Sequence, residues 1–136
     1  MIFYTGKLTQ AYPGDVGWDM YSTTQIVMES ITTRRVPYKI PTGVKLELPE
    51  GYWAQVLPRS GNSADGLNVA PGQIDTGYRG EIFVVCYSLK SILIPEGFKI
   101  AQLVFHKKCN EPLRYKYEIE DNTERSQRGF GSSNAS

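Results

Sequence analysis

The chain has 136 residues, 40% of them hydrophobic and 21% charged, which is typical of one globular domain and excludes a disordered protein. Fifteen lysines and arginines against fourteen acids give a net charge of +1, so we expect no nucleic-acid partner. The two cysteines lack metal-binding spacing and indicate free thiols in a reducing compartment. With no signal-peptide pattern and no membrane-length apolar run, we expect no membrane association and a soluble intracellular protein, either cytoplasmic or, if its source is eukaryotic or viral, nuclear.

The first half of the chain predicts β-strands separated by turns. Residues 44–48 alternate apolar and polar side chains, which is the pattern of a half-buried strand. A Pro-Glu-Gly turn follows, and residues 52–58, "YWAQVLP", read as the next strand. The stretch "SGNSADG" is compatible with a single helical turn.

The second half continues in the same way. Residues 81–89, "EIFVVCYSL", form a continuous apolar run that we interpret as a core strand. Residues 92–105, "ILIPEGFKIAQLVF", predict a strand, a turn and another strand, and residues 113–120, "LRYKYEIE", alternate again. Helical spacing is nearly absent, so the predicted fold is all-β.

Two stretches carry groups suited to phosphate and metal. In "PRSGNS", Arg59 offers planar donors, Ser60 a hydroxyl and Gly61 an unobstructed backbone N–H. In "GDVGWDMYS", Asp19 either caps a turn or holds the water shell of a divalent metal such as Mg²⁺, which takes few protein ligands. Each pattern alone is common in ordinary turns.

The stretch "GQIDTGYRGE", residues 72–81, concentrates more chemistry in one turn. Asp75 is compatible with an Asx-type turn, and Tyr78 with simple packing. The alternative is that the carboxylate orients and deprotonates a water beside a ring that lies against a sugar.

The C-terminal stretch "EDNTERSQRGFGSSNAS", residues 120–136, is polar and rich in glycine and serine. One interpretation is a frayed tail, since such a segment buries too little surface to stay ordered unaided. The other is a loop that closes over a phosphorylated ligand, with arginines for phosphate and an aromatic side chain for a base.

Five stretches in order resemble the motifs of the trimeric deoxyuridine triphosphatases (dUTPases) and span nearly the whole chain. They are "GWDMYS", "PRSG", "GQIDTGYRGE", "GFKIAQLVF" and "RSQRGFGSS". The resemblance implies a jelly-roll-like β-barrel over residues 1–119 and a flexible C-terminal arm over residues 120–136. It also implies a homotrimer in which the arm of one subunit closes a site built by the other two.

The same resemblance implies a hydrolase that converts dUTP to dUMP and pyrophosphate with Mg²⁺. Asp75 then positions the attacking water, and Tyr78 stacks under deoxyribose and excludes a 2′-hydroxyl. Asp19 contacts Mg²⁺ through water. The implied substrate-binding set comprises Arg59, Ser60 and Gly61, Gln102, Asn68 toward the base, Arg125 toward the terminal phosphate, Phe130 over uracil, and Gly131, Ser132 and Ser133.

Three departures from the family pattern stand out. Ser126 and Arg128 replace glycines that the family tends to have in the arm. Residues 62–71 are a few residues short in the region that normally reads uracil. Lys99 stands where arginine is frequent, which keeps the charge but loses the planar fork.

Three other readings remain open. A deoxycytidine triphosphate deaminase shares the fold, but it needs a further acid in the strand "IFVVCYS", which has none. A regulatory nucleotide-binding relative without turnover is the second alternative, against which the retained Asp75 argues. A generic β-barrel with a frayed tail is the third, and it treats five ordered motifs as coincidence.

Overall fold

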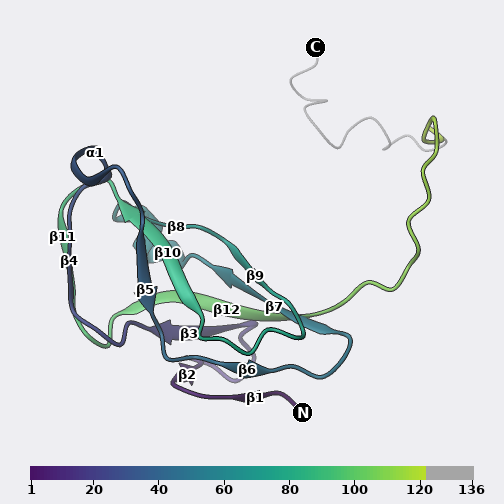
Figure 1. Cartoon of the computed structure of the whole chain (residues 1–136), viewed down its shortest axis with the longest axis horizontal. Coiled ribbons are helices and arrows are strands. Elements are labelled where there is room, and N and C mark those ends of the chain that lie inside the picture. The colour runs from purple at the N-terminus through teal and green to yellow at the C-terminus, as the bar shows by residue number, and fades with distance from the viewer. Residues whose placement is uncertain (122–136) are drawn as a thin grey trace.

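The computed structural model describes residues 1–121 and confirms the all-β fold (Figure 1). Twelve strands and two short helices lie in this part of the chain. In chain order they are β1 Phe3–Tyr4, β2 Leu8–Thr9, β3 Gly17–Tyr21, β4 Ile26–Met28, α1 Ile31–Arg34, β5 Tyr38–Pro41, β6 Leu46–Glu47, β7 Tyr52–Leu57, α2 Ser60–Ala64, β8 Leu67–Val69, β9 Gly72–Ile74, β10 Phe83–Ser88, β11 Ile92–Ile94 and β12 Lys99–Lys107.

The strands form four sheets around one core. The largest has the order β2-β3-β12-β7-β9, with the nine-residue β12 at its centre. A second sheet has the order β5-β10-β8, and two-stranded sheets pair β11 with β4 and β1 with β6. The pairs in these sheets are antiparallel, and most join strands distant in sequence.

The five-stranded sheet has an apolar inner face and an outer face of mixed polar and apolar side chains. Inner side chains such as Met20, Ala54 and Leu103 are completely buried. Because side chains alternate along a strand, their neighbours Asp19 and Gln102 lie on the outer face. The candidate site residues of these strands therefore share one surface of one sheet.

Strand β10 lies where the sequence predicts a core strand, and one of its two faces is buried. Val84, Cys86 and Ser88 are buried, whereas the alternate side chains of Phe83 and Tyr87 are 43% and 36% exposed. The second face, although also apolar, is left partly exposed within residues 1–121.

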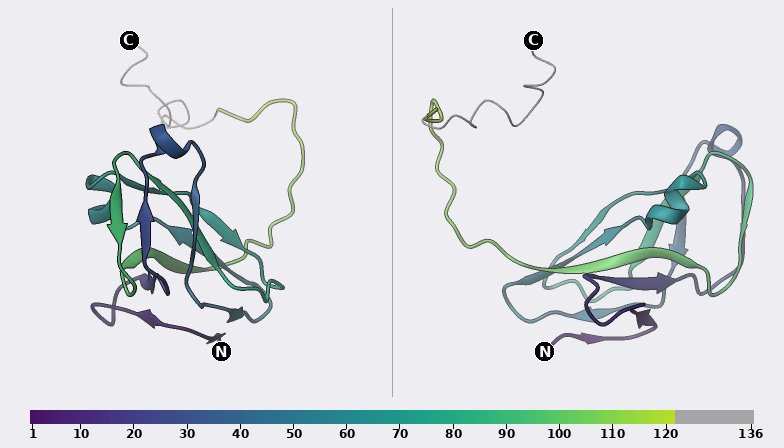
Figure 2. Two further views of the ribbon diagram at one scale, coloured as in Figure 1. Left: turned by 60° about the vertical axis from the view of Figure 1, so that its left-hand side comes forward. Right: turned by 180° about the vertical axis from the view of Figure 1, so that it is seen from behind.

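Residues 113–120 are not a strand, contrary to the expectation from their alternation. The segment leads away from the barrel (Figure 1 and Figure 2). Within residues 1–121 it has no strand to pair with, and a strand forms only against a partner. Its apolar side chains are at least 83% exposed: Leu113, Tyr115, Tyr117 and Ile119.

The two cysteines are free, as predicted, but differ in environment. Cys109 is exposed beyond β12, and Cys86 is buried in β10. Burial raises the pKa of the Cys86 thiol to about 11, so this thiol stays protonated at neutral pH. None of the helices in the described part of the chain is long and apolar enough to span a bilayer.

Candidate active site

Asp19, Arg59 and Gln102 meet at one end of the five-stranded sheet. Asp19 on β3 is in register with Gln102 on β12, which in turn faces Leu57 at the end of β7. Arg59 follows shortly after β7, and its Nε donates to Asp19 Oδ1 at 3.0 Å. Gln102 Nε2 donates to the carbonyl oxygen of Pro58 at 2.9 Å. Three segments distant in sequence thus converge at what we call the arginine end.

Gln102 owes its position to the glycine across the strand pair. A Cβ on Gly17 would lie 2.2 Å from Gln102 Oε1, far inside van der Waals contact. The absence of a side chain at Gly17 therefore leaves room for the Gln102 amide on the outer face of the sheet.

Lys99 is a second cation on the same carboxylate. Its Nζ lies 3.6 Å from Asp19 Oδ2, while Arg59 occupies Oδ1. The Asp19 side chain is 17% exposed, so the paired charges sit at the mouth of the site rather than in the core. The sequence interpretation treated Lys99 only as a replacement for arginine. Nothing in the sequence signals this contact, because residues three apart on a regular strand point to opposite faces, and the register of β12 with β3 shifts between Lys99 and Ala101.

A cavity of about 420 Å³ opens beside these ion pairs. It is lined by Ala11, Asp15, Val16, Gly17, Asp19, Arg59, Ser60, Gly61 and Gln102. A guanidinium, a hydroxyl and a side-chain amide around one open space suit an anion with several oxygens. Residues 11–16 were not expected here, because nothing in their sequence marks them as site residues.

The arginine end fits a metal only in an indirect role. Among residues 1–121, no three acidic, histidine or cysteine side chains cluster as metal ligands. Both Asp19 oxygens already contact cations. A lone carboxylate of this kind can contact the waters of a Mg²⁺ ion whose other ligands are phosphate oxygens.

Asp75 and Tyr78 lie in a separate turn after β9. The turn closes through a hydrogen bond from the Tyr78 N–H to the Asp75 carbonyl at 3.0 Å. Gln73 Nε2 donates to Asp75 Oδ1 at 2.9 Å. Thr76 Oγ1 donates to the carbonyl oxygen of Tyr52, which attaches the turn to β7. We call this region the aspartate turn.

The Tyr78 ring is held at its tip and flanked by a glycine. Its hydroxyl donates to the Glu81 carbonyl oxygen at 2.9 Å, and the side chain remains 45% exposed. A Cβ on Gly80 would lie 2.6 Å from Tyr78 Oη and 2.8 Å from Cζ. The "YRG" sequence therefore gives the ring a defined place with an accessible face.

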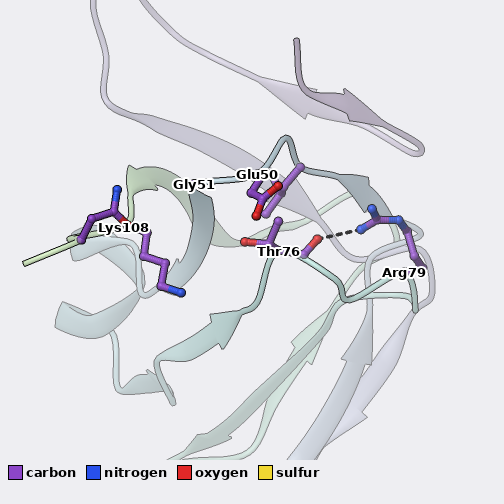
Figure 3. A pocket seen from close by; sticks show the side chains of 7 residues that line it. Glu50, Gly51, Thr76, Arg79 and Lys108 are labelled. Atoms are coloured by element: carbon purple, nitrogen blue, oxygen red, sulfur yellow. Dashed lines mark hydrogen bonds between the residues drawn. The ribbon is translucent and has the colours of Figure 1, made fainter. Parts of the chain in front are cut away.

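A second cavity, of about 710 Å³, adjoins the aspartate turn but is not lined by Asp75 or Tyr78 (Figure 3). Thr76 and Arg79 contribute to it from the turn, and Arg79 Nη1 donates to the Thr76 carbonyl oxygen at 2.8 Å. Glu50 and Lys108 lie on other parts of its wall. The predicted water-orienting acid is therefore outside this cavity.

The aspartate turn and the arginine end are far apart within one chain. Strand β9 runs antiparallel to β7 with Ile74 opposite Ala54, so Asp75 is level with Trp53. Arg59 lies about six residues after Trp53 in the direction of β7, which corresponds to roughly 20 Å at about 3.3 Å per residue. The structure does not bring Asp75 and Arg59 together in a single subunit.

The remaining predicted residues are placed as follows. Asn68 lies on β8 opposite Tyr87 of β10, and its Nδ2 donates to the carbonyl oxygen of Gly66 at 3.2 Å. Its contact with the base stays a prediction. Five further predicted residues lie outside the described part of the chain, namely Arg125, Phe130, Gly131, Ser132 and Ser133.

The sequence matches a known protein family and several of its members. The dUTPase family model matches residues 5–134. The chain is 38% identical over 128 residues to deoxyuridine 5'-triphosphate nucleotidohydrolase of Clostridium novyi (strain NT), covering 90% of this chain and 87% of that protein. It is 39% identical over 127 residues to the Clostridium kluyveri protein of the same name, covering 90% and 85%.

Solved structures show the same fold. The dUTPase of Staphylococcus bacteriophage 80alpha with dUPNHPP is 26% identical, with a TM-score of 0.79 and 98% coverage of both chains. A mutant dUTPase from phage phi11 of S. aureus, described with a structural Mg(II) ion, is 22% identical. It has a TM-score of 0.76 and covers 88% of this chain and 98% of the phage chain.

Proposed function

Since the chain belongs to the dUTPase family, we propose that it hydrolyses dUTP to dUMP and pyrophosphate, with Asp75 orienting the attacking water. The observation that carries the proposal is the cavity at the arginine end. It collects Asp19, Arg59, Ser60, Gly61 and Gln102 from three of the family motifs. Residues that the family resemblance implies for phosphate and metal thus line one open space.

Asp75 acts as the general base in this proposal. Its carboxylate accepts a proton from a water aimed in line at the α-phosphorus. The exposed face of the Tyr78 ring packs against deoxyribose, where a 2′-hydroxyl has no room. These two residues supply the attacking group and the sugar selectivity.

The arginine end binds the triphosphate. The Arg59 guanidinium, held by Asp19 through Nε, keeps its terminal nitrogens for phosphate oxygens, and Ser60 and Gln102 add hydrogen bonds. Lys99 adds positive charge beside Asp19. Asp19 is the residue that would contact the waters of a phosphate-bound Mg²⁺, and such an ion would supply positive charge for the leaving pyrophosphate.

A homotrimer with shared sites reconciles the two distant regions. The aspartate turn of one subunit then meets the arginine end of a neighbour, and the arm of residues 120–136 closes the site with Arg125 and Phe130. Two apolar surfaces support assembly, because soluble proteins rarely leave such surfaces open. They are the outer face of β10 and the alternating segment of residues 113–119.

The deaminase alternative lacks its acid in this structure. The buried side chains of β10 are Val84, Cys86 and Ser88, and the strand contains no carboxylate. Hydrolysis is therefore the chemistry that the site favours.

The test is Asp75→Asn, assayed with dUTP and Mg²⁺ for pyrophosphate and with dCTP for ammonia. We expect kcat for dUTP to fall by roughly three orders of magnitude or more, with nearly unchanged binding of the analogue dUpNHpp, because the substitution removes the base but keeps the shape. Full turnover in this variant would show that Asp75 is not the base. Ammonia release from dCTP by the unmodified protein would favour the deaminase.

A further inference from the structure

Gln73 is the side chain that contacts the Asp75 carboxylate. Gln73 alternates with the core-packed Ile74 on β9 and so projects from the outer face of the five-stranded sheet, and Asp75 follows directly after that strand. The Gln73 side chain is long enough to reach along the strand, and its Nε2 donates to Asp75 Oδ1 at 2.9 Å. Within residues 1–121, no other side chain donates a hydrogen bond to this carboxylate.

The neighbouring polar side chain on this face is hydrogen-bonded to a residue other than Asp75. Gln55 on β7 is directly opposite Gln73, but its Oε1 pairs with His106 Nε2 at 3.0 Å. The His106 ring is itself stacked on Trp53, with ring centroids 4.4 Å apart and an interplanar angle of 17°. The Gln73 amide is thus directed along its own strand to Asp75, next to a fixed row of side chains on β7 and β12.

We propose that Gln73 is a positioning residue for the general base. The inference rests on the proposed function of Asp75. The last torsion of an aspartate is broad and roughly two-fold, so an isolated exposed carboxylate rotates freely. A hydrogen bond to Oδ1 restricts that rotation and leaves Oδ2 to accept from the attacking water. Gln73 does not touch the substrate in this arrangement, and it acts through Asp75.

The decisive variant is Gln73→Met, which keeps the length of the side chain and removes the donor. We expect kcat for dUTP to fall roughly tenfold, because even a small displacement of a catalytic group from its productive position lowers the reaction rate. KM for dUTP and the affinity for dUpNHpp should stay within about twofold, because the triphosphate is bound by the arginine end. The melting temperature should not change, since the Gln73 side chain is exposed.

A second variant tests the effect of a negative charge beside Asp75. Gln73→Glu removes the donor and sets a carboxylate beside Asp75, so its kcat should fall further than that of Gln73→Met. Gln25→Met, an exposed glutamine at the edge of β4 in a different sheet, is the matched control and should keep the kcat of the unmodified protein. A Gln73→Met kcat within twofold of the unmodified value would overturn the inference.

A double-variant cycle separates this inference from the proposed function. In the Asp75→Asn background, Gln73→Met should leave the residual rate unchanged, because the group that it positions is gone. An equal fold-loss in both backgrounds would refute positioning through Asp75. If Asp75→Asn by itself keeps full turnover, the base assignment fails together with the inference. If Asp75→Asn is inactive while Gln73→Met is fully active, only the positioning role fails.

Discussion

The two ends of the outer sheet face are built in different ways. At the arginine end, hydrogen bonds join residues 40 and 44 positions apart in sequence, as in Arg59 to Asp19 and Gln102 to Pro58. At the aspartate turn, most side-chain hydrogen bonds span three positions or fewer, as in Gln73 to Asp75 and Tyr78 to Glu81, and the bond from Thr76 to Tyr52 is the long-range exception. The first region therefore depends on strand register throughout the barrel, and the second is largely encoded in one short peptide. Substitutions at the two ends should therefore affect the activity of the protein in different ways.

The largest expected effect comes from mixing two inactive proteins. Asp75→Asn lacks the proposed base, and Arg59→Gln lacks the proposed phosphate ligand, so each alone should be nearly inactive. If the two ends meet between subunits, each site needs an intact Asp75 from one subunit and an intact Arg59 from its neighbour. In a mixture of equal amounts, each condition holds with a probability of about one half, so co-refolding should restore about one quarter of full activity. Turnover by the mixture is measured as pyrophosphate release.

The matched control mixes Arg59→Gln with Gln102→Ala. Both variants damage the same end, so no interface regains a complete arginine end and the mixture should remain at the level of its parts. If Asp75→Asn and Arg59→Gln likewise stay inactive together, the shared site is excluded.

Gly17→Ala should damage the arginine end without unfolding the barrel. The new methyl group would lie 2.2 Å from Gln102 Oε1, and the flexible end of that side chain must move away. We expect kcat/KM for dUTP to fall roughly tenfold, about 1.4 kcal/mol, with a small change in melting temperature. Gly14→Ala is the control, because nothing lies within 4 Å of its Cβ position. Equal activity of the two variants would show that the Gln102 position is unimportant.

Gly80→Ala should have a smaller effect, confined to sugar selectivity. Its Cβ would lie 2.6 Å from Tyr78 Oη and push the ring from its place. We expect the preference for dUTP over UTP, as a ratio of kcat/KM values, to fall by roughly threefold to tenfold. Gly77→Ala in the same turn is the control, since its Cβ position is open. Unaltered selectivity in Gly80→Ala would separate Tyr78 from sugar discrimination.

Much of the fold and the local chemistry could be predicted from the sequence. Period-two alternation identified the buried faces of Val44, Leu46 and Leu48, and the expected helical turn is α2. The aspartate turn was recognisable because its groups are adjacent in the chain. The convergence of Asp19 with Lys99 was not derivable from either motif alone, because it depends on the pairing of β3 with β12.

Two apolar segments are more exposed than their patterns indicate. The core-strand interpretation of residues 81–89 holds for one face of β10, and residues 113–120, which alternate like a strand, do not form one. An apolar pattern indicates a surface that favours burial, and it does not say what covers that surface. Phe83 and Tyr117 remain 43% and 88% exposed within residues 1–121.

The contrast between the two thiols makes the molecule easy to tag. Cys86 is enclosed and protonated at neutral pH, whereas Cys109 is accessible where the chain leaves the last strand. A maleimide dye added to the native protein should therefore attach at one position per chain, without mutagenesis. Energy transfer between donor-labelled and acceptor-labelled chains would then test whether copies of the protein associate.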